Sequence, residues 1–123
     1  MPSPAQMEAA VHAYVAAFAA GDPDMAAAIF ADDAVIEDPI GTEPKVGKQA
    51  IREFYVQSMA TGARLHLAGP VRVAAAHAAF AIQVRLHWDG KDMAIAVIDT
   101  FAFNEAGQVT EMKAYFGPGN MHG

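Results

Sequence analysis

The stretch AAFAIQVRLHWDGKDMAIAVIDTFAFN, residues 78–104, decides the fold of this chain. Large apolar residues alternate with small or polar ones on both sides of Asp89-Gly90, a dipeptide typical of a two-residue hairpin turn. This alternation predicts two long antiparallel strands, Ala78 to Trp88 and Met93 to Asn104, each with one face turned toward a core. A polar side chain on that face therefore needs a physical explanation.

More strands and three helices are expected around this hairpin. The other strands are predicted at Arg64 to Leu67, at Val71 to Ala75 and, after a looser turn over 104–107, at Gln108 to Phe116. Because helices come first and a run of strands follows, the sequence predicts an α+β fold. We expect a cone-shaped arrangement, with three N-terminal helices packed on a curved, mostly antiparallel sheet. The length of 123 residues predicts a single domain over 1–123.

Capping residues mark where the helices begin and end. Ser3, Pro4 and Gln6 form the signature of a capping box at the start of the first helix, which we expect to end at Gly21. Asp22-Pro23 starts a second helix in the same way, with an expected run through Phe30 and a break at Asp32-Asp33. A short strand is then predicted at Ala34 to Asp38, and a third helix at Lys48 to Met59.

Composition narrows the possible functions. Hydrophobic residues make up 54% of the chain and charged residues 18%, so a chain this short needs an internal apolar pocket or a self-association surface besides its core. The net charge of −6 disfavours nucleic acid and anionic membranes as partners. Without cysteine there is no disulfide, no thiolate metal site and no Cys nucleophile. The sequence also shows no membrane span and no secretion signal, so a cytoplasmic location is expected.

Motifs for metals and cofactors are missing from the sequence. The five histidines show no metal-ligand spacing and are expected to be scattered over the surface and sheet edges. The glycines form no phosphate-binding fingerprint. We therefore predict neither a metal site nor a cofactor.

Asp99 is the first polar residue on an apolar face. It shares its strand face with five large apolar residues, namely Met93, Ile95, Val97, Phe101 and Phe103. Burial of an ionised carboxylate is so unfavourable that the group takes up a proton or finds a partner. No Lys or Arg shares this face, so a protonated Asp99 that donates a hydrogen bond is expected, although a backbone amide would also satisfy it.

Asp38 and Tyr14 are two further candidates. Asp38 shares its strand face with Ala34 and Ile36, and Pro39 restricts the backbone that follows. Taken alone, it is better explained as a strand end before a turn. Tyr14 lies on the apolar stripe of the first helix, where a buried hydroxyl needs a partner, although a tyrosine there is more often an ordinary core residue.

General acid–base chemistry links these three residues if they meet in one pocket. A carboxylate base removes a proton from carbon when an adjacent carbonyl becomes an enolate stabilised by strong hydrogen-bond donors in a dry site. A tyrosine hydroxyl and a protonated carboxylic acid are two such donors. If the base returns the proton to another carbon, the net result is migration of an allylic double bond without a cofactor.

The chain resembles the bacterial ketosteroid isomerases, within the nuclear-transport-factor-2-like superfamily. The resemblance covers nearly the whole chain, and its specific parts are Glu-Asp-Pro at 37–39 and Ile-Asp at 98–99. It implies a steroid isomerase that moves the C5–C6 double bond of a 3-oxo-Δ5-steroid into conjugation with the C3 ketone, and a homodimer. This family is itself the known case of a carboxylic acid kept neutral in an apolar site.

The resemblance also implies the roles of individual residues. Asp38 is the expected general base, and Tyr14 with Asp99 forms the expected oxyanion hole. Residues expected to line or support the steroid pocket are Tyr55 (behind the catalytic tyrosine), Phe54, Trp88, Phe116, Phe101 and Val97.

Fold alone does not fix function, so other functions stay open. A related polyketide cyclase would share the fold, and a non-catalytic carrier of a steroid or another flat apolar ligand would share the pocket. A pure interaction domain is a third possibility, although it gives no reason for Asp99 on an apolar face.

Overall fold

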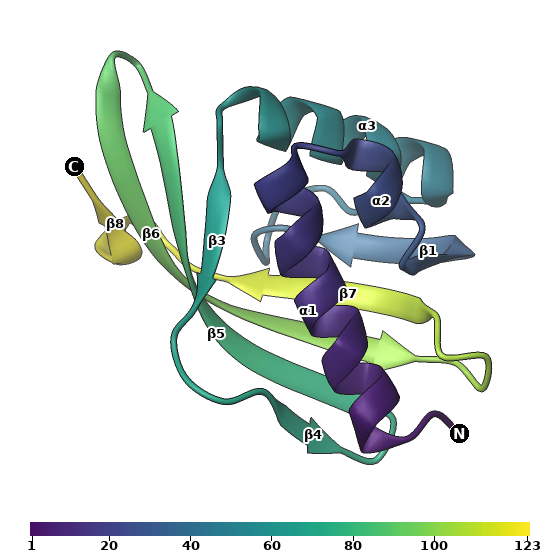
Figure 1. The fold of residues 1–123 in the computed structure, drawn as a ribbon. Helices are drawn as coiled ribbons and strands as arrows, with labels where there is room; N and C mark the ends of the chain where they lie inside the picture. The colour runs from purple at the N-terminus through teal and green to yellow at the C-terminus, as the bar shows by residue number, and fades with distance from the viewer.

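The computed structural model describes all residues, 1–123, as three helices packed against one curved sheet (Figure 1). The α+β prediction is confirmed. The helices are α1 (Pro4–Ala20), α2 (Pro23–Ala27) and α3 (Lys48–Ala60), with a short 3₁₀ helix η1 (Pro118–Asn120) near the C-terminus. The strands are β1 (Phe30–Glu37), β2 (Lys45–Val46), β3 (Arg64–Leu67), β4 (Arg72–Ala74), β5 (His77–Trp88), β6 (Lys91–Phe103), β7 (Val109–Tyr115) and β8 (Met121–His122).

The capping residues place α1 as expected. The Ser3 hydroxyl accepts a hydrogen bond from the Gln6 backbone N–H at 3.1 Å, and the Gln6 side chain accepts one from the Ser3 N–H at 2.7 Å. Gly21 ends the helix at φ +62°, a left-handed conformation that favours glycine. The buried face of α1 includes Met7, Val11, Tyr14 and Phe18, so the helical period predicted from the sequence is confirmed.

The expected boundary between α2 and β1 is wrong. The helix ends at Ala27, and β1 begins at Phe30 rather than at Ala34. Phe30 pairs with Val109 of β7, and the Val109 N–H donates to the Ile29 carbonyl at 3.0 Å. Asp32 and Asp33 therefore lie exposed inside the strand, where its register shifts, instead of breaking a helix.

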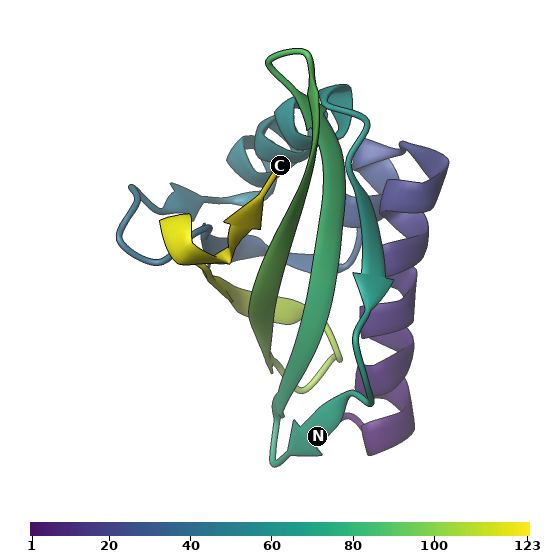
Figure 2. The same cartoon turned by 90° about the vertical axis from the view of Figure 1, so that its left-hand side faces the viewer.

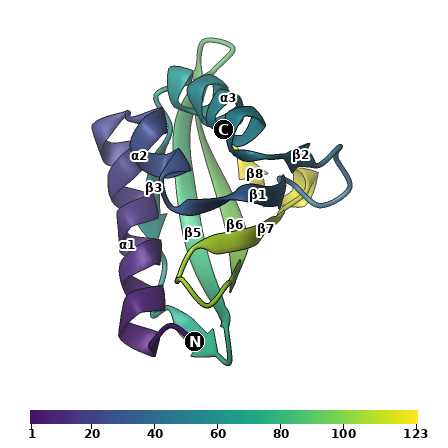
Figure 3. The same cartoon turned by 90° about the vertical axis from the view of Figure 1, so that its right-hand side faces the viewer.

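The strands form a single sheet in the order β2-β1-β7-β6-β5-β3, with β4 pairing to β5 and β8 to β6. The long hairpin β5–β6 is confirmed, with Asp89 and Gly90 at φ +52° and +74° in its turn. All neighbours are antiparallel except β1 and β7, which run parallel side by side (Figure 3). The short strands β2 and β8 were not predicted.

The inner face of the sheet carries the core, and the outer face is open. Asp99, Phe101 and Phe103 of β6 are buried beneath the helices. On the opposite face of the same strand Ile98 is 46% exposed. Figure 2 shows this outer face of β5 and β6 turned toward the viewer, with α1, α2 and α3 beside or behind the sheet. None of the helices is both long enough and apolar enough to cross a membrane.

Candidate active site

An apolar cavity of about 250 Å³ opens between the helices and the inner face of the sheet. Twelve of the 16 residues in its wall are hydrophobic. The four others are Asp38, Ser58, Thr61 and Asp99. Ligand pockets of this kind combine an apolar lining with a few convergent polar groups, so this cavity is the candidate active site.

Asp99 lies at the buried end of the cavity. Side chains alternate between the two faces of a strand, so Asp99 of β6 points to the same inner face as Val97 and Phe101. The residue is 2% exposed, and its carboxyl group makes no hydrogen bond or ion pair within the chain. Burial raises the pKa of Asp99 well above its usual value, and the charge of Asp38 raises it further. Burial therefore favours the protonated form of Asp99, which has a proton to donate into the cavity.

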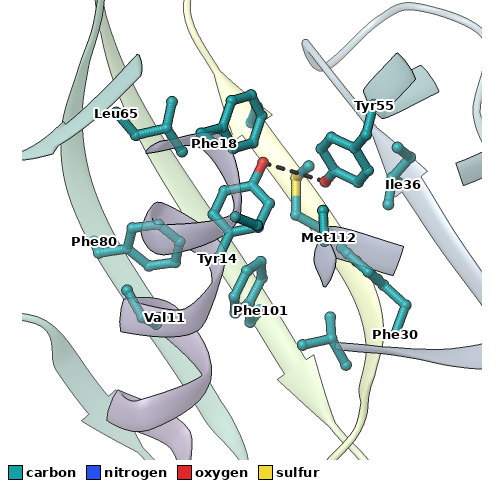
Figure 4. Close-up of a cluster of buried hydrophobic side chains, with 14 of the residues drawn as sticks. Val11, Tyr14, Phe18, Phe30, Ile36, Tyr55, Leu65, Phe80, Phe101 and Met112 are labelled. Atoms are coloured by element: carbon teal, nitrogen blue, oxygen red, sulfur yellow. Dashed lines mark hydrogen bonds between the residues drawn. The ribbon is translucent and has the colours of Figure 1, made fainter. Parts of the chain in front are cut away.

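Tyr14 reaches the cavity from α1, and its ring is held by packing. The ring makes edge contacts with Phe18 and Phe101, with centroids 5.4 and 5.3 Å apart. The buried Tyr55 hydroxyl donates a hydrogen bond to the Tyr14 oxygen at 3.2 Å (Figure 4). The proton of Tyr14 is thus left for an acceptor in the cavity. Burial raises the pKa of both tyrosines well above the ordinary value, so both hydroxyls stay protonated.

Asp38 follows directly after β1 and is partly buried. The next turn is tied to the sheet, because the Ile40 N–H donates to the Ala114 carbonyl of β7 at 2.8 Å. Asp38 makes no hydrogen bond of its own, and burial raises its pKa to about 6. Near neutral pH this carboxylate is mostly ionised but holds its proton far more readily than an ordinary Asp.

The two carboxyl groups line one cavity, and burial raises the pKa of both. Their surroundings differ, because the charge of Asp38 raises the pKa of the more deeply buried Asp99 further. Pairs of titratable groups whose surroundings push their pKa values apart are typical of acid–base sites. One base and two donors in an apolar cavity are able to move a proton between carbon atoms while an oxyanion is stabilised.

The structure separates the other predicted pocket residues into two groups. Phe54, Trp88, Val97 and Phe116 line the cavity, and Trp88 is 59% exposed at its mouth. Phe101 does not line it, because its ring is fully buried among aromatic side chains behind Tyr14. Tyr55 likewise lies behind the cavity wall.

Part of the cavity wall was missed by the sequence reasoning. Ser58 follows Phe54 by one helical turn, and its hydroxyl donates to the Phe54 carbonyl at 3.0 Å. Thr61 caps the same helix end. The opposite wall includes Ile82, Val84 and Leu86, which alternate along β5. This alternation was visible in the sequence, but which apolar residues face a cavity rather than solid core depends on packing.

The structure contains no group of three or more His, Asp or Glu side chains that is arranged to hold a metal ion. The chemistry described above uses only side chains of this chain.

Comparisons with known proteins show the family to which the chain belongs. The profile of the SnoaL-like domain matches residues 11–112. A steroid Delta-isomerase from Nocardioides simplex is 38% identical over 117 residues, which cover 95% of this chain and 94% of that protein. A solved structure described as SalBIII, an epoxide hydrolase/cyclase-like enzyme in pyran ring formation in the polyether salinomycin, superposes with a TM-score of 0.91. It is 20% identical over 98% of both chains, so it supports the fold alone.

The matched region contains all three helices except the first turns of α1 and nearly the whole sheet, and the resemblance to the nuclear-transport-factor-2-like superfamily is confirmed. The chain belongs to the family of SnoaL-like domains and is a relative of a steroid Delta-isomerase.

Proposed function

We propose that this protein is a cofactor-independent steroid isomerase that moves the C5–C6 double bond of a 3-oxo-Δ5-steroid into conjugation with its C3 ketone. The observation that carries the proposal is the set of three polar groups, Asp38, Tyr14 and Asp99, that face one apolar cavity. The 38% identity to a steroid Delta-isomerase supports the same reaction and substrate class.

The reaction begins with proton removal from carbon. The ionised Asp38 takes the proton from C4, which is acidic because it lies next to the C3 carbonyl. The electrons of the C–H bond form a dienolate, and its oxygen receives hydrogen bonds from Tyr14 and from the protonated Asp99. Asp38 then delivers the same proton to C6, so the carboxylate is regenerated and the double bond ends between C4 and C5.

The surroundings of these groups suit each role. A base with a pKa of about 6 is ionised at neutral pH yet holds a proton long enough to return it. Two donors in an apolar cavity stabilise an oxyanion more strongly than water does. The apolar wall suits the flat hydrocarbon skeleton of a steroid.

The deciding experiment follows the absorbance of the conjugated enone as the protein acts on 5-androstene-3,17-dione. We expect rapid turnover by the wild type and a fall in kcat of roughly 10²–10⁴-fold for Asp38→Asn, which is the contribution of a positioned base. Asp33→Asn is the matched control, because Asp33 is an exposed carboxylate of β1. Its kcat should equal that of the wild type.

Other results would change the assignment. A wild-type protein that binds the steroid without turnover would be a carrier, and Asp38→Asn would then leave the affinity largely unchanged. A protein that neither binds nor converts the steroid would have another substrate, as a related polyketide cyclase would.

We also propose that the protein is cytoplasmic and works as a homodimer joined through the part of the outer sheet face around Ile98 and Tyr115, which are paired neighbours on β6 and β7. The exposed side chains of Ile98 and Tyr115 on that face support the dimer. Sedimentation would test it, and a monomer at micromolar concentration would contradict it.

A further inference from the structure

A second, larger hollow of about 600 Å³ lies on the outside of the sheet. Its wall comes from the end of α3, from β3, β5 and β6, and from the C-terminal residues. It holds two of the four arginines in the chain and three of its five histidines, namely Arg64, Arg85, His66, His87 and His122. We call this hollow the cationic groove. A hollow that gathers arginines and histidines is unexpected in a protein whose net charge is −6.

The two arginines of the groove lie side by side on neighbouring strands, and neither makes an ion pair with an acidic side chain. Arg64 of β3 pairs directly with Arg85 of β5 in the sheet register, an arrangement in which like charges destabilise a sheet. Arg85 makes no ion pair, and Arg64 donates only to main-chain carbonyls, with the Ala63 oxygen at 3.0 Å. The one acidic side chain of the groove, Asp92, is paired with His87 at 3.0 Å. An anion from outside the chain would relieve this repulsion.

The groove is continuous with the mouth of the apolar cavity. Thr61 and Leu86 line both hollows. Along β5 the side chains become progressively more exposed, from the buried Ile82 to Trp88 at the mouth. A ligand whose ketone lies beside Asp99 therefore has its far end close to Thr61 and Leu86.

The size of the apolar cavity also indicates that the far end of a ligand extends beyond it. Its volume of about 250 Å³ is below the roughly 300–1,000 Å³ of pockets that enclose a drug-sized ligand. A polycyclic ketone with a side chain would therefore extend beyond the mouth. The cationic groove adjoins this cavity at Thr61 and Leu86, so its charged groups are available to such a side chain.

We infer that the cationic groove binds an anionic group, such as a carboxylate, on the side chain of the ligand whose ketone end occupies the apolar cavity. Arginine suits this role because its planar fork of N–H donors matches a carboxylate or a phosphate. The histidines add further N–H donors. The substrate class is then a polycyclic 3-ketone with a negatively charged tail, which rests on the proposed isomerase function.

The test compares an acid with its own ester. The acid 3-oxochol-5-en-24-oic acid and its methyl ester share the reacting rings and differ in the charge of the tail. We expect the wild type to show a KM for the acid about fivefold lower than for the ester, as for a partly exposed charge pair. This advantage should shrink in 1 M NaCl, where the Debye length is about 3 Å.

Arginine variants assign the effect to the groove. In the double variant Arg64→Gln/Arg85→Gln the acid and the ester should have the same KM, while kcat for the ester is unchanged. Arg72→Gln is the matched control, because Arg72 is an exposed arginine of β4 outside the groove. It should keep the fivefold ratio, and unchanged turnover of the ester shows that each variant is folded.

Three outcomes would overturn the inference. One is equal KM values for acid and ester in the wild type, and another is a ratio that survives the double variant. The third is that free phosphate binds to the wild type but not to the double variant in calorimetry, while the ratio of the KM values for acid and ester is the same in both proteins. The groove would then bind a free anion and not the tail of the substrate. If the wild type converts neither these compounds nor 5-androstene-3,17-dione, the proposed isomerase fails instead, and arginine-dependent preference for the acid in direct binding still tests the groove.

Discussion

The buried end of the cavity and the aromatic cluster directly behind it differ in what they contribute to the protein. The cluster consists of rings in edge contact, from Tyr14, Phe18, Phe30, Tyr55, Phe80 and Phe101 (Figure 4). It buries apolar surface and stabilises the fold. In front of it, Asp38 and Asp99 make no hydrogen bond, and burial raises the pKa of both carboxyl groups. The aromatic cluster therefore contributes stability to the fold. The two buried carboxyl groups, which carry the proposed chemistry, lower that stability.

Phe101→Ala tests the stabilising side of this comparison and has the largest expected effect. Phe101 is fully buried and contacts the rings of Tyr14, Phe80 and Phe103. Its removal leaves a cavity, so the free energy of unfolding in urea should fall by about 3–5 kcal/mol. Val46→Ala, in the edge strand β2 where Val46 is 65% exposed, should cost about 0.5 kcal/mol. Equal losses at the two positions would contradict the distinction between buried and exposed apolar side chains.

Asp99→Leu tests the other side, because it should weaken catalysis and strengthen the fold. Loss of one oxyanion donor is expected to lower kcat by roughly 10²–10³-fold. The folded-state pKa of Asp99 lies above its unfolded value, so at pH 7 folding moves the carboxyl group into surroundings that disfavour its ionised form. Leucine removes this unfavourable contribution, so the melting temperature at pH 7 should rise.

Asp99→Asn is the informative companion variant. Its amide N–H is able to donate where the carboxylic acid did, so it should recover part of the activity that Asp99→Leu loses. If both variants lost activity equally, Asp99 would not act as a donor. If Asp99→Leu melted at a lower temperature than the wild type, the buried carboxyl would be a stabilising group.

The sequence predicted the elements whose causes are local. The capping residues around Ser3 and the Asp89-Gly90 turn specify structure through near neighbours, and both predictions are confirmed. The start of β1 was wrong because it depends on parallel pairing with β7, about 80 residues further along the chain. The adjacent residues Asp32 and Asp33 predicted a break between helix and strand, whereas the pairing of β1 with β7 carries the strand through them.

The cavity was predictable only in part for a similar reason. Alternation along β6 places Asp99 and Phe101 on one face, and the structure confirms this. Yet Asp99 borders a cavity while Phe101, two residues away, is packed among rings. How far the helices stand from the sheet decides between the two environments, and no local pattern encodes that distance.

The pH dependence of Asp38 gives a smaller effect with a defined direction. Its folded-state pKa of about 6 exceeds its unfolded value, so the folded protein binds more protons between about pH 4 and 6. The contribution of Asp38 to stability is therefore least favourable above pH 6 and improves as pH falls through this window. Asp38→Asn should be more stable than the wild type at pH 7, by at most about 3 kcal/mol, and this difference should vanish near pH 4.

Activity should follow the same ionisation in the opposite direction. Because only the ionised base is competent, kcat/KM should fall about tenfold per pH unit below pH 6. Urea unfolding and turnover measured from pH 4 to 8 test both trends, with Asp33→Asn as the control for an exposed carboxylate of β1. A stability difference independent of pH would mean that Asp38 keeps an ordinary pKa.

Tyr55→Phe has the smallest expected effect, but it acts at the junction of the two regions. The Tyr55 ring belongs to the aromatic cluster, and its hydroxyl donates the hydrogen bond that reaches the Tyr14 oxygen. Loss of the hydroxyl keeps the ring packing and removes one neutral hydrogen bond, so stability should fall by about 1 kcal/mol. Tyr115→Phe, which alters an exposed tyrosine of β7, is the matched control and should change neither stability nor kcat.

The effect of Tyr55→Phe on catalysis tests whether the aromatic cluster contributes to catalysis or only to stability. A hydrogen bond donated to the Tyr14 oxygen makes Tyr14 a better donor, because linked hydrogen bonds polarise one another. We therefore expect kcat to fall by about threefold, with KM unchanged, since the interaction strengthens as the oxyanion forms. A threefold rise in KM alone would mean that Tyr55 only shapes the pocket. Loss of stability with full kcat would make the cluster a purely structural support, and Tyr14 would then act without help from behind.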